Sequence, residues 1–438
     1  MSNPMILARV VSRVFALLSC LAFVVAAADA GAKREKKAGG EPAERAVGLN
    51  RQVAENLGKA IELFESDRFD EALAIVDELA KRRRLKPPDI AQIHRFRGYI
   101  YVSKGHSEAA TEEFEQALVQ HALDRFAEQQ TTYSLAQLYT QLGKYASALE
   151  LIDAWFAGAE SPTPDAYFLK AMILVQQEKF EAALEPAQIA VGMTETPRES
   201  WVQLLVAIGI ELQDYPSVAA NLERLIDISP NKKRYWVQLA AVRNHLKQDA
   251  KALATLRLAR QAELLSEDRD FRQLARLLFL RDLPFQCAQE MGRAITSGSV
   301  EADADSYRML SNCYIAAREL DLALEPLAKA GELAPDGEMY MLLGQMHLQH
   351  ERFDAALEVL EKALAKSKPE QRGSVQLLIG VAQLGLQRFD AAERAFRSAS
   401  SDAKVGAAAR SYLEFVEEQR LRKEQLGQLR ETRTIAME

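Results

Sequence analysis

Cysteine is almost absent from this chain: only three occur among 438 residues, too few for a scaffold built on disulfides. Glycine and proline are also sparse, with 21 and 14 residues, which excludes collagen-like and low-complexity sequences. Since 48% of the residues are hydrophobic and 27% are charged, the chain is not mainly disordered. The formal net charge of −7 provides no basic field for general binding to nucleic acid. These shortages leave a folded protein with an ample hydrophobic core.

The sequence also lacks the local motifs of enzymes. It contains no glycine-rich phosphate loop, no nucleophile elbow and no His-Glu-x-x-His helix. Of its six histidines, only His347 and His350 share a local motif, and no cysteine or third histidine follows to complete a metal site. We therefore expect a non-enzymatic protein with no cofactor and no metal.

The amino terminus has the three parts of a secretory signal. Arg9 and Arg13 precede an apolar run at residues 14–28, and Ala28-Asp29-Ala30 supplies the small-x-small end. We predict cleavage after Ala30. The alternative is an uncleaved membrane anchor, although the apolar run is short for a bilayer.

The remainder of the chain repeats one pattern: an aromatic or apolar residue, two spacers and a small residue that opens an amphipathic run. The small residues, at intervals of 33 to 38, are Ala72, Ala110, Ala148, Ala183, Val218, Ala252, Ala288, Ala323, Ala356 and Ala392. In most copies a second small residue lies twelve positions earlier, which lets two helices approach closely. The copies with Val206 and Arg276 at that earlier position match least well. A unit of this length and pattern is typical of the tetratricopeptide (TPR) helix–turn–helix repeat, whose period is about 34 residues.

We predict an all-α fold, a right-handed superhelical solenoid of about ten TPR hairpins between residues 53 and 402 with a C-terminal capping helix. Each hairpin can bury its apolar face only against its neighbours, so the repeats should stack rather than form separate globules. The predicted organisation is a signal peptide at 1–30, a flexible linker at 31–50, the TPR solenoid at 51–402, and the capping helix and tail at 403–438.

Two cysteines fall at one junction of this predicted stack. Cys287 belongs to the second helix of repeat seven and Cys313 to the first helix of repeat eight. Residues so placed can be neighbours, and an exported protein meets an oxidising environment. The sequence leaves open both a disulfide and two small buried cysteines.

In repeats of this kind the first helices line a concave groove. The reference point is the small residue of each first helix. The positions three residues before it, one residue after it and about four residues after it face inward. The predicted lining is Tyr133, Gln137, Gln141, Phe168, Met172, Gln203, Asn244, Arg308, Asn312, Gln345 and Gln349. Carboxamides both donate and accept hydrogen bonds, so they can pair with the backbone of an extended peptide. Only Arg234 and Arg308 interrupt this neutral lining, so we expect electrostatic capture to be secondary.

Several strings resemble one bacterial family, the secreted TPR proteins described as components of the TonB transport system. The strings are Tyr133-Ser-Leu-Ala-Gln-Leu-Tyr139, Ala154-Trp-Phe156, Ala166-Tyr-Phe-Leu-Lys-Ala171, Tyr235-Trp-Val-Gln-Leu239, Ala-Leu-Glu-Pro at 183–186 and 323–326, and Pro335-Asp-Gly-Glu338. The resemblance covers about residues 130 to 400 in matching order.

The resemblance implies a periplasmic scaffold that assists energy-coupled uptake through outer-membrane receptors. Its expected partners are proteins or extended peptide segments, among them TonB-type motor or receptor components, and no nucleic acid. No catalytic residue carries over. The alternative function is a scaffold for assembling outer-membrane or cell-wall components, and the alternative location is the inner membrane, through an uncleaved signal.

Export predicts a defined new amino terminus. If the signal is removed after Ala30, amino-terminal sequencing of the protein from a periplasmic fraction begins at Gly31. Recovery of the apolar run at residues 14–28 in a membrane pellet would show that the segment is an anchor instead.

Overall fold

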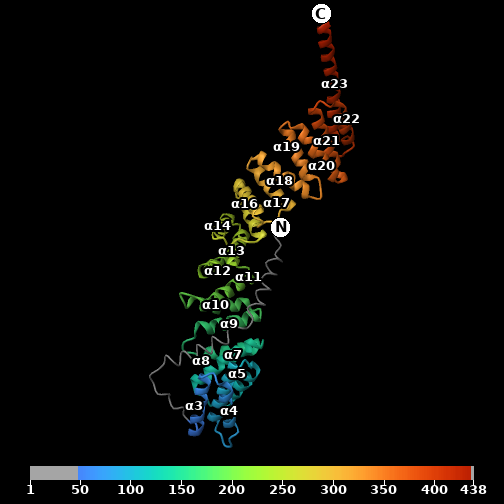
Figure 1. The fold of residues 1–438 in the computed structure, drawn as a ribbon. Coiled ribbons are helices and arrows are strands. Elements are labelled where there is room, and N and C mark those ends of the chain that lie inside the picture. Colours follow the sequence, from blue (N-terminus) through green and yellow to red (C-terminus); the bar gives the residue numbers. More distant parts are fainter. Residues whose placement is uncertain (1–47, 436–438) are drawn as a thin grey trace. The chain divides into compact units, whose positions relative to one another are not determined.

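The computed structural model describes residues 48–435, and side chains up to residue 426. The predicted signal at 1–30, most of the linker at 31–50 and the last three residues lie outside the described residues. The described chain contains helices and no strand, which confirms the all-α prediction (Figure 1). No helix between residues 48 and 435 is long and apolar enough to cross a membrane.

The described chain divides after Pro230 into two compact units, each built from five helical hairpins. The hairpins of the first unit are α3 (Arg51–Glu65) with α4 (Phe69–Ala80), α5 (Pro87–Ser103) with α6 (Ser107–Val119), α7 (Arg125–Gln141) with α8 (Tyr145–Gly158), α9 (Pro164–Gln176) with α10 (Phe180–Gly192), and α11 (Glu199–Glu211) with α12 (Tyr215–Ile228).

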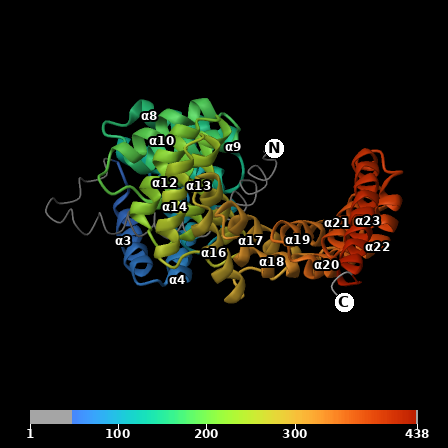
Figure 2. The ribbon, with the colours of Figure 1, turned by 90° about the horizontal axis from the view of Figure 1, so that it is seen from above.

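The second unit continues the same alternation and adds one helix. Its hairpins are α13 (Lys233–His245) with α14 (Asp249–Gln261), α15 (Asp268–Leu280) with α16 (Pro284–Thr296), α17 (Ala304–Ala316) with α18 (Leu320–Leu333), α19 (Glu338–Gln349) with α20 (Phe353–Lys366), and α21 (Pro369–Gly385) with α22 (Phe389–Ala399). The last helix, α23 (Gly406–Ile435), lies within the segment predicted as capping helix and tail, and it packs on α22 (Figures 1 and 2).

The same turn joins the two helices of every hairpin. One residue adopts a left-handed backbone conformation, with φ between 55° and 76°, and the next N–H donates to the carbonyl five residues before it. In α9–α10, for example, Glu178 has φ 59° and the Lys179 N–H donates to the Leu174 carbonyl at 2.9 Å. This Schellman bond satisfies a carbonyl at the end of the first helix. The left-handed residue is glycine at only two of the ten turns, Gly105 and Gly143.

Small side chains let the two helices of a hairpin approach each other. The recurring residue of the second helix is fully buried in each hairpin, and its partner twelve positions earlier faces it. A Cβ added at Gly380 would lie 2.4 Å from the Phe396 ring, and one at Gly98 would lie 2.5 Å from the Phe114 ring. These distances are far below van der Waals contact, so only glycine fits beside a phenylalanine there.

The structure corrects the register that the sequence suggested for repeat seven. Its left-handed turn residue is Asp282, and the small residue five positions later is Cys287 rather than Ala288. The facing small residue is Ala275, which is fully buried, whereas Arg276 is exposed. The apparent mismatch at Arg276 therefore came from counting one residue too far.

The capping helix joins the stack through contacts that the repeats also use. In three hairpins the aspartate at the second position of the second helix pairs with a basic residue of the following repeat; Asp354 with Arg388 at 3.3 Å is one case. Arg420 of α23 makes the equivalent pair with Asp390 at 2.7 Å. Beneath it Val416 is buried, and Tyr412 stacks on Phe396 with ring centroids 5.0 Å apart. Exposed ion pairs contribute little, so the apolar contacts hold the cap.

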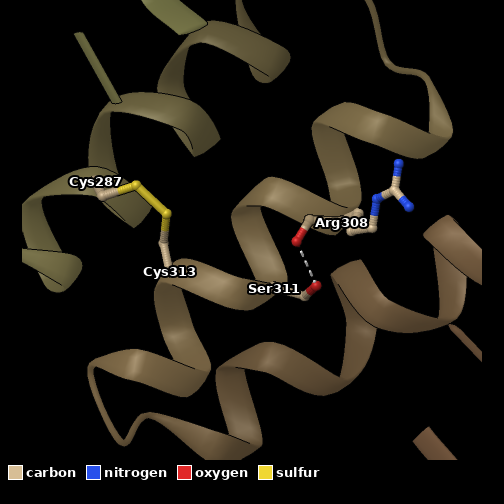
Figure 3. Close-up of a disulfide and its surroundings, with 4 residues drawn as sticks. All are labelled: Cys287, Arg308, Ser311 and Cys313. Carbon is tan, nitrogen blue, oxygen red and sulfur yellow. Dashed lines mark hydrogen bonds between the residues drawn. A yellow bond between two sulfur atoms is a disulfide. The ribbon is translucent and has the colours of Figure 1, made fainter. Parts of the chain in front are cut away.

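A disulfide links Cys287 of α16 to Cys313 of α17, with their Cα atoms 5.8 Å apart (Figure 3). Of the two alternatives that the sequence left open, the structure therefore shows the disulfide. Both cysteines are buried, and the bond ties the second helix of repeat seven to the first helix of repeat eight.

Reducing this disulfide should destabilise its surroundings. The bond closes a loop of 26 residues, and a loop of that size is worth about 3–4 kcal/mol of unfolding free energy in the chain-entropy treatment. In hydrogen exchange, a reductant should raise the rates of the amides of α16 and α17 more than those of α3 to α6. A Cys287→Ala/Cys313→Ala variant is the control, because its exchange should not respond to reductant. Equal rates in the wild type with and without reductant would contradict the prediction.

Candidate protein-binding face

Successive first helices contact one another within each unit, for example α9 with α11 and α19 with α21. Side chains three residues before and one, four and five residues after the recurring small residue of each first helix therefore share one surface. We call this surface the first-helix face, and describe it separately for the two units. These are the positions of the residues that the sequence predicted as the groove lining.

In the first unit, Tyr133 and Gln137 of α7 lie together on this face. Burial raises the pKa of the Tyr133 phenol, and the nearby Asp165 carboxylate adds to the rise. The centroid of the Tyr133 ring lies 5.3 Å from that of the Trp155 ring.

Phe168 of α9 does not serve as an exposed anchor, contrary to the prediction. Its side chain is only 3% exposed, and its ring centroid lies 5.9 Å from that of Trp201 on α11. Because α9 and α11 touch, a large side chain at this position is enclosed between them. Phe168 is therefore part of the core.

The other predicted residues of the first unit differ in exposure and in hydrogen bonding. Gln141 is exposed and Met172 is half-buried. The Gln203 amide donates to Glu199 at 2.8 Å, so it already has an internal partner.

Charged groups that the sequence reasoning missed also border this part of the face. Arg198 pairs with Asp165 one repeat earlier, and its guanidinium lies 5.0 Å above the Trp201 ring. Because the pair joins residues 33 positions apart, a regular repeat spacing between an acidic and a basic residue was the signal for it.

In the second unit, the predicted carboxamides are more open. Asn312 of α17 and Gln349 of α19 are exposed, and Gln345 is half-buried. Within the described residues none of these three side chains has a hydrogen bond or other partner. Asn244 is exposed, and its Nδ2 lies 3.5 Å from Oδ1 of Asp249.

The corrected register of repeat seven changes the charge of this face. Arg308 is present as predicted and pairs with Asp305 of its own helix. Arg272 and Arg276 of α15 now occupy the positions three before and one after the small residue Ala275. The expectation of an almost neutral lining is therefore wrong for the second unit.

Two histidines near the end of α19 do not assemble a metal site. Burial lowers the pKa of His347, with further contributions from Arg352 and His350, and its Nδ1 is buried without a hydrogen-bond partner. In the described part of the chain, no group of three or more His, Cys, Asp or Glu side chains is placed to hold a metal ion.

Comparison with known proteins agrees with the hairpin architecture. Residues 57–128, 133–199 and 308–372 match the sequence profile of the tetratricopeptide repeat. These three segments are tetratricopeptide repeats. The profile leaves out residues 200–307, where the small-residue pattern is weakest, yet α11 to α16 form helical hairpins with the same turn there. No curated protein sequence matches the chain.

Solved TPR structures resemble the chain at low identity. A tetratricopeptide repeat protein from Parabacteroides merdae is 14% identical and covers 67% of this chain and 98% of its own, with a TM-score of 0.33. The C-terminal part of a TPR protein from Cytophaga hutchinsonii is 13% identical and covers 64% and 95%, with a TM-score of 0.39. The TPR2AB domain of yeast Sti1, solved as a complex with an HSP90 peptide, is 13% identical and covers 58% and 98%, with a TM-score of 0.33. TM-scores this low carry no argument about the ligand of this chain.

TPR proteins are generally non-catalytic scaffolds that bind proteins or peptides. The first-helix face is thus the candidate protein-binding site. The structure shows Gln141, Asn312 and Gln349 exposed on it and removes Phe168 from it.

The burial of Phe168 predicts a stability effect. Phe168→Ala should lower the unfolding free energy by about 3–5 kcal/mol, as for other buried phenylalanines, and should raise hydrogen exchange in α9 and α11. Met172→Ala, at a half-buried position of the same helix, should cost clearly less. Unchanged exchange in Phe168→Ala would show that the side chain is not part of the core.

Proposed function

We propose that the protein is a periplasmic scaffold that holds an extended segment of a partner protein against its first-helix face, as an accessory of a TonB-type transport system. The observation that carries the proposal is the set of unpartnered carboxamides on successive first helices, Asn312 on α17 and Gln345 and Gln349 on α19. Each can donate to a carbonyl and accept from an N–H of the partner backbone.

Several such bonds are needed for useful affinity. A neutral hydrogen bond contributes only about 1 kcal/mol net, since both groups give up water. A repeated face supplies equivalent bonds from successive hairpins, and an extended segment is the shape that can reach them in turn.

The disulfide supports the proposed compartment. Disulfides persist in oxidising environments such as the bacterial periplasm and are rare in the cytosol. The Cys287–Cys313 bond is therefore compatible with the export that the amino-terminal sequence predicts. The place in a TonB-type system rests on the strings between residues 133 and 338 that resemble that family.

Site-specific crosslinking in intact cells tests this proposal. A photoreactive residue at Gln141 in the first unit or Gln349 in the second would sample the first-helix face, since both side chains are exposed. Matched probes at Glu150 of α8 and Glu361 of α20 sample exposed positions on second helices. Crosslinked products are identified by mass spectrometry.

The expected result is a crosslink from Gln141 or Gln349 to a proton-driven motor component, a TonB-like protein or an outer-membrane receptor. Crosslinks to outer-membrane or cell-wall assembly factors would replace the transport role with the alternative scaffold role. If only Glu150 and Glu361 capture a partner, the first-helix face is not the working surface.

A further inference from the structure

The face of α15 carries an exposed cation beside two exposed apolar side chains. Arg276 is exposed, and within the described residues it has no ion pair or hydrogen bond. One turn further, Phe279 is 43% exposed and Leu280 is 55% exposed. We call these three residues the α15 patch.

The patch is unusual within its unit. On the five first helices between residues 231 and 435, Phe279 and Leu280 are the only large hydrophobic side chains that are exposed. Exposing such groups costs free energy, and a compact apolar patch with a polar border is typical of a binding surface.

Electrostatics set the patch apart from the arginines beside it. Arg269 pairs with Glu267 at 2.8 Å, and Arg308 pairs with Asp305. Arg272 has two partners, Asp268 and Asp303, the latter at 3.2 Å. Arg276 is thus the arginine of this surface whose charge is not balanced by a neighbour. A carboxylate of a ligand could pair with Arg276 and balance its charge.

The helix next to the patch, α17, is attached to the preceding hairpin at two points along its length. On the α15 side, Arg272 donates to Ser306 of α17 at 2.8 Å and to Asp303. Seven residues further along the same buried face of α17, Cys313 is bonded to Cys287 of α16, and Figure 3 shows Arg308 pointing away from this disulfide. Asn312 of α17 is exposed between these attachments. A surface fixed in this way loses little freedom when it binds.

The spacing within the patch specifies a ligand pattern. Leu280 lies four positions after Arg276, a rise of about 6 Å along a helix at about 1.5 Å per residue. An extended chain covers about 6.6 Å in two residues and points both side chains to the same side. A carboxylate at one position and a large apolar side chain two positions away would therefore meet Arg276 and the Phe279–Leu280 pair together.

We propose that the α15 patch selects an extended protein segment in which an acidic residue lies two positions from a large apolar residue. The proposal deepens the proposed function and rests on it, because it names what the first-helix face of the second unit recognises. Asn312 of α17 can hold the backbone of the same segment.

A defined peptide probe tests the patch. Random dodecapeptides displayed on phage are selected on the immobilised full-length chain, and the enriched sequence is synthesised with a fluorescent label. We expect an Asp or Glu two positions from Phe, Leu, Ile or Trp. In fluorescence polarisation, Arg276→Glu should weaken binding at least about tenfold, because it places like charges together. A peptide with Lys in place of the acidic residue should regain affinity for Arg276→Glu.

Matched controls lie on α14. Arg257 and Leu258 are an exposed arginine and leucine of a second helix in the same unit. Arg257→Glu and Leu258→Ala should leave the affinity within about twofold, whereas Phe279→Ala and Leu280→Ala should each weaken it about fivefold or more. All these residues are exposed, so circular dichroism should show unchanged helix content in every variant.

The outcomes separate the patch from the general function. Peptides without the acidic–apolar pattern, or equal binding by wild type and Arg276→Glu, overturn the α15 proposal. If the enriched peptides bind more weakly to Gln345→Ala or Gln349→Ala, the scaffold function stands without the α15 proposal. If no peptide is enriched, both proposals fail. Binding to phosphatidylglycerol vesicles that disappears in Arg276→Glu, with no peptide enriched, would reassign the patch to a membrane surface.

Discussion

Each hairpin of this protein depends on the contact between two small side chains, one on each helix and twelve residues apart. At Gly98 and Gly380 a phenylalanine of the second helix fills the space that a Cβ would need, and at Gly344 the side chain of Leu360 does so. This close approach brings the apolar faces of both helices into one layer, and the next hairpin packs on that layer. The stack, the exposed first-helix face and the position of the disulfide all follow from it.

The turn between the helices depends on the same packing. A left-handed residue is easiest for glycine, yet eight of the ten turns place another residue there, such as Asp67, Gln213 or Glu351. A non-glycine residue in this conformation costs about 1–2 kcal/mol. The Schellman bond and the buried helix pair offset that cost, so tertiary packing rather than turn composition selects the conformation.

The functional surface is sensitive to register for a geometric reason. One residue along an α-helix is a rotation of about 100°, so an error of one position exchanges a buried side chain for an exposed one. In repeat seven, Leu277 is buried whereas Arg276 is exposed. The shift turns an apolar stretch of the first-helix face into a cationic one. The sequence pattern assigned the recurring small position to Ala288 and counted Cys287 as a spacer. A cysteine is nevertheless small enough to occupy that position.

Periodicity in the sequence was sufficient to determine the helical class, the number of hairpins and the helix of each candidate residue, because small residues recur at nearly constant intervals. It also placed Cys287 and Cys313 at one junction. Whether those cysteines bond depends on the distance between two helices, and whether Phe168 is exposed depends on how closely α11 approaches α9. The same holds for the balance of charge around Arg276, since its neighbours come from other turns and other helices. Spacing along one helix defines the direction in which a side chain points. Its burial and its partners depend on the neighbouring helices that it meets, so only the tertiary structure decided them.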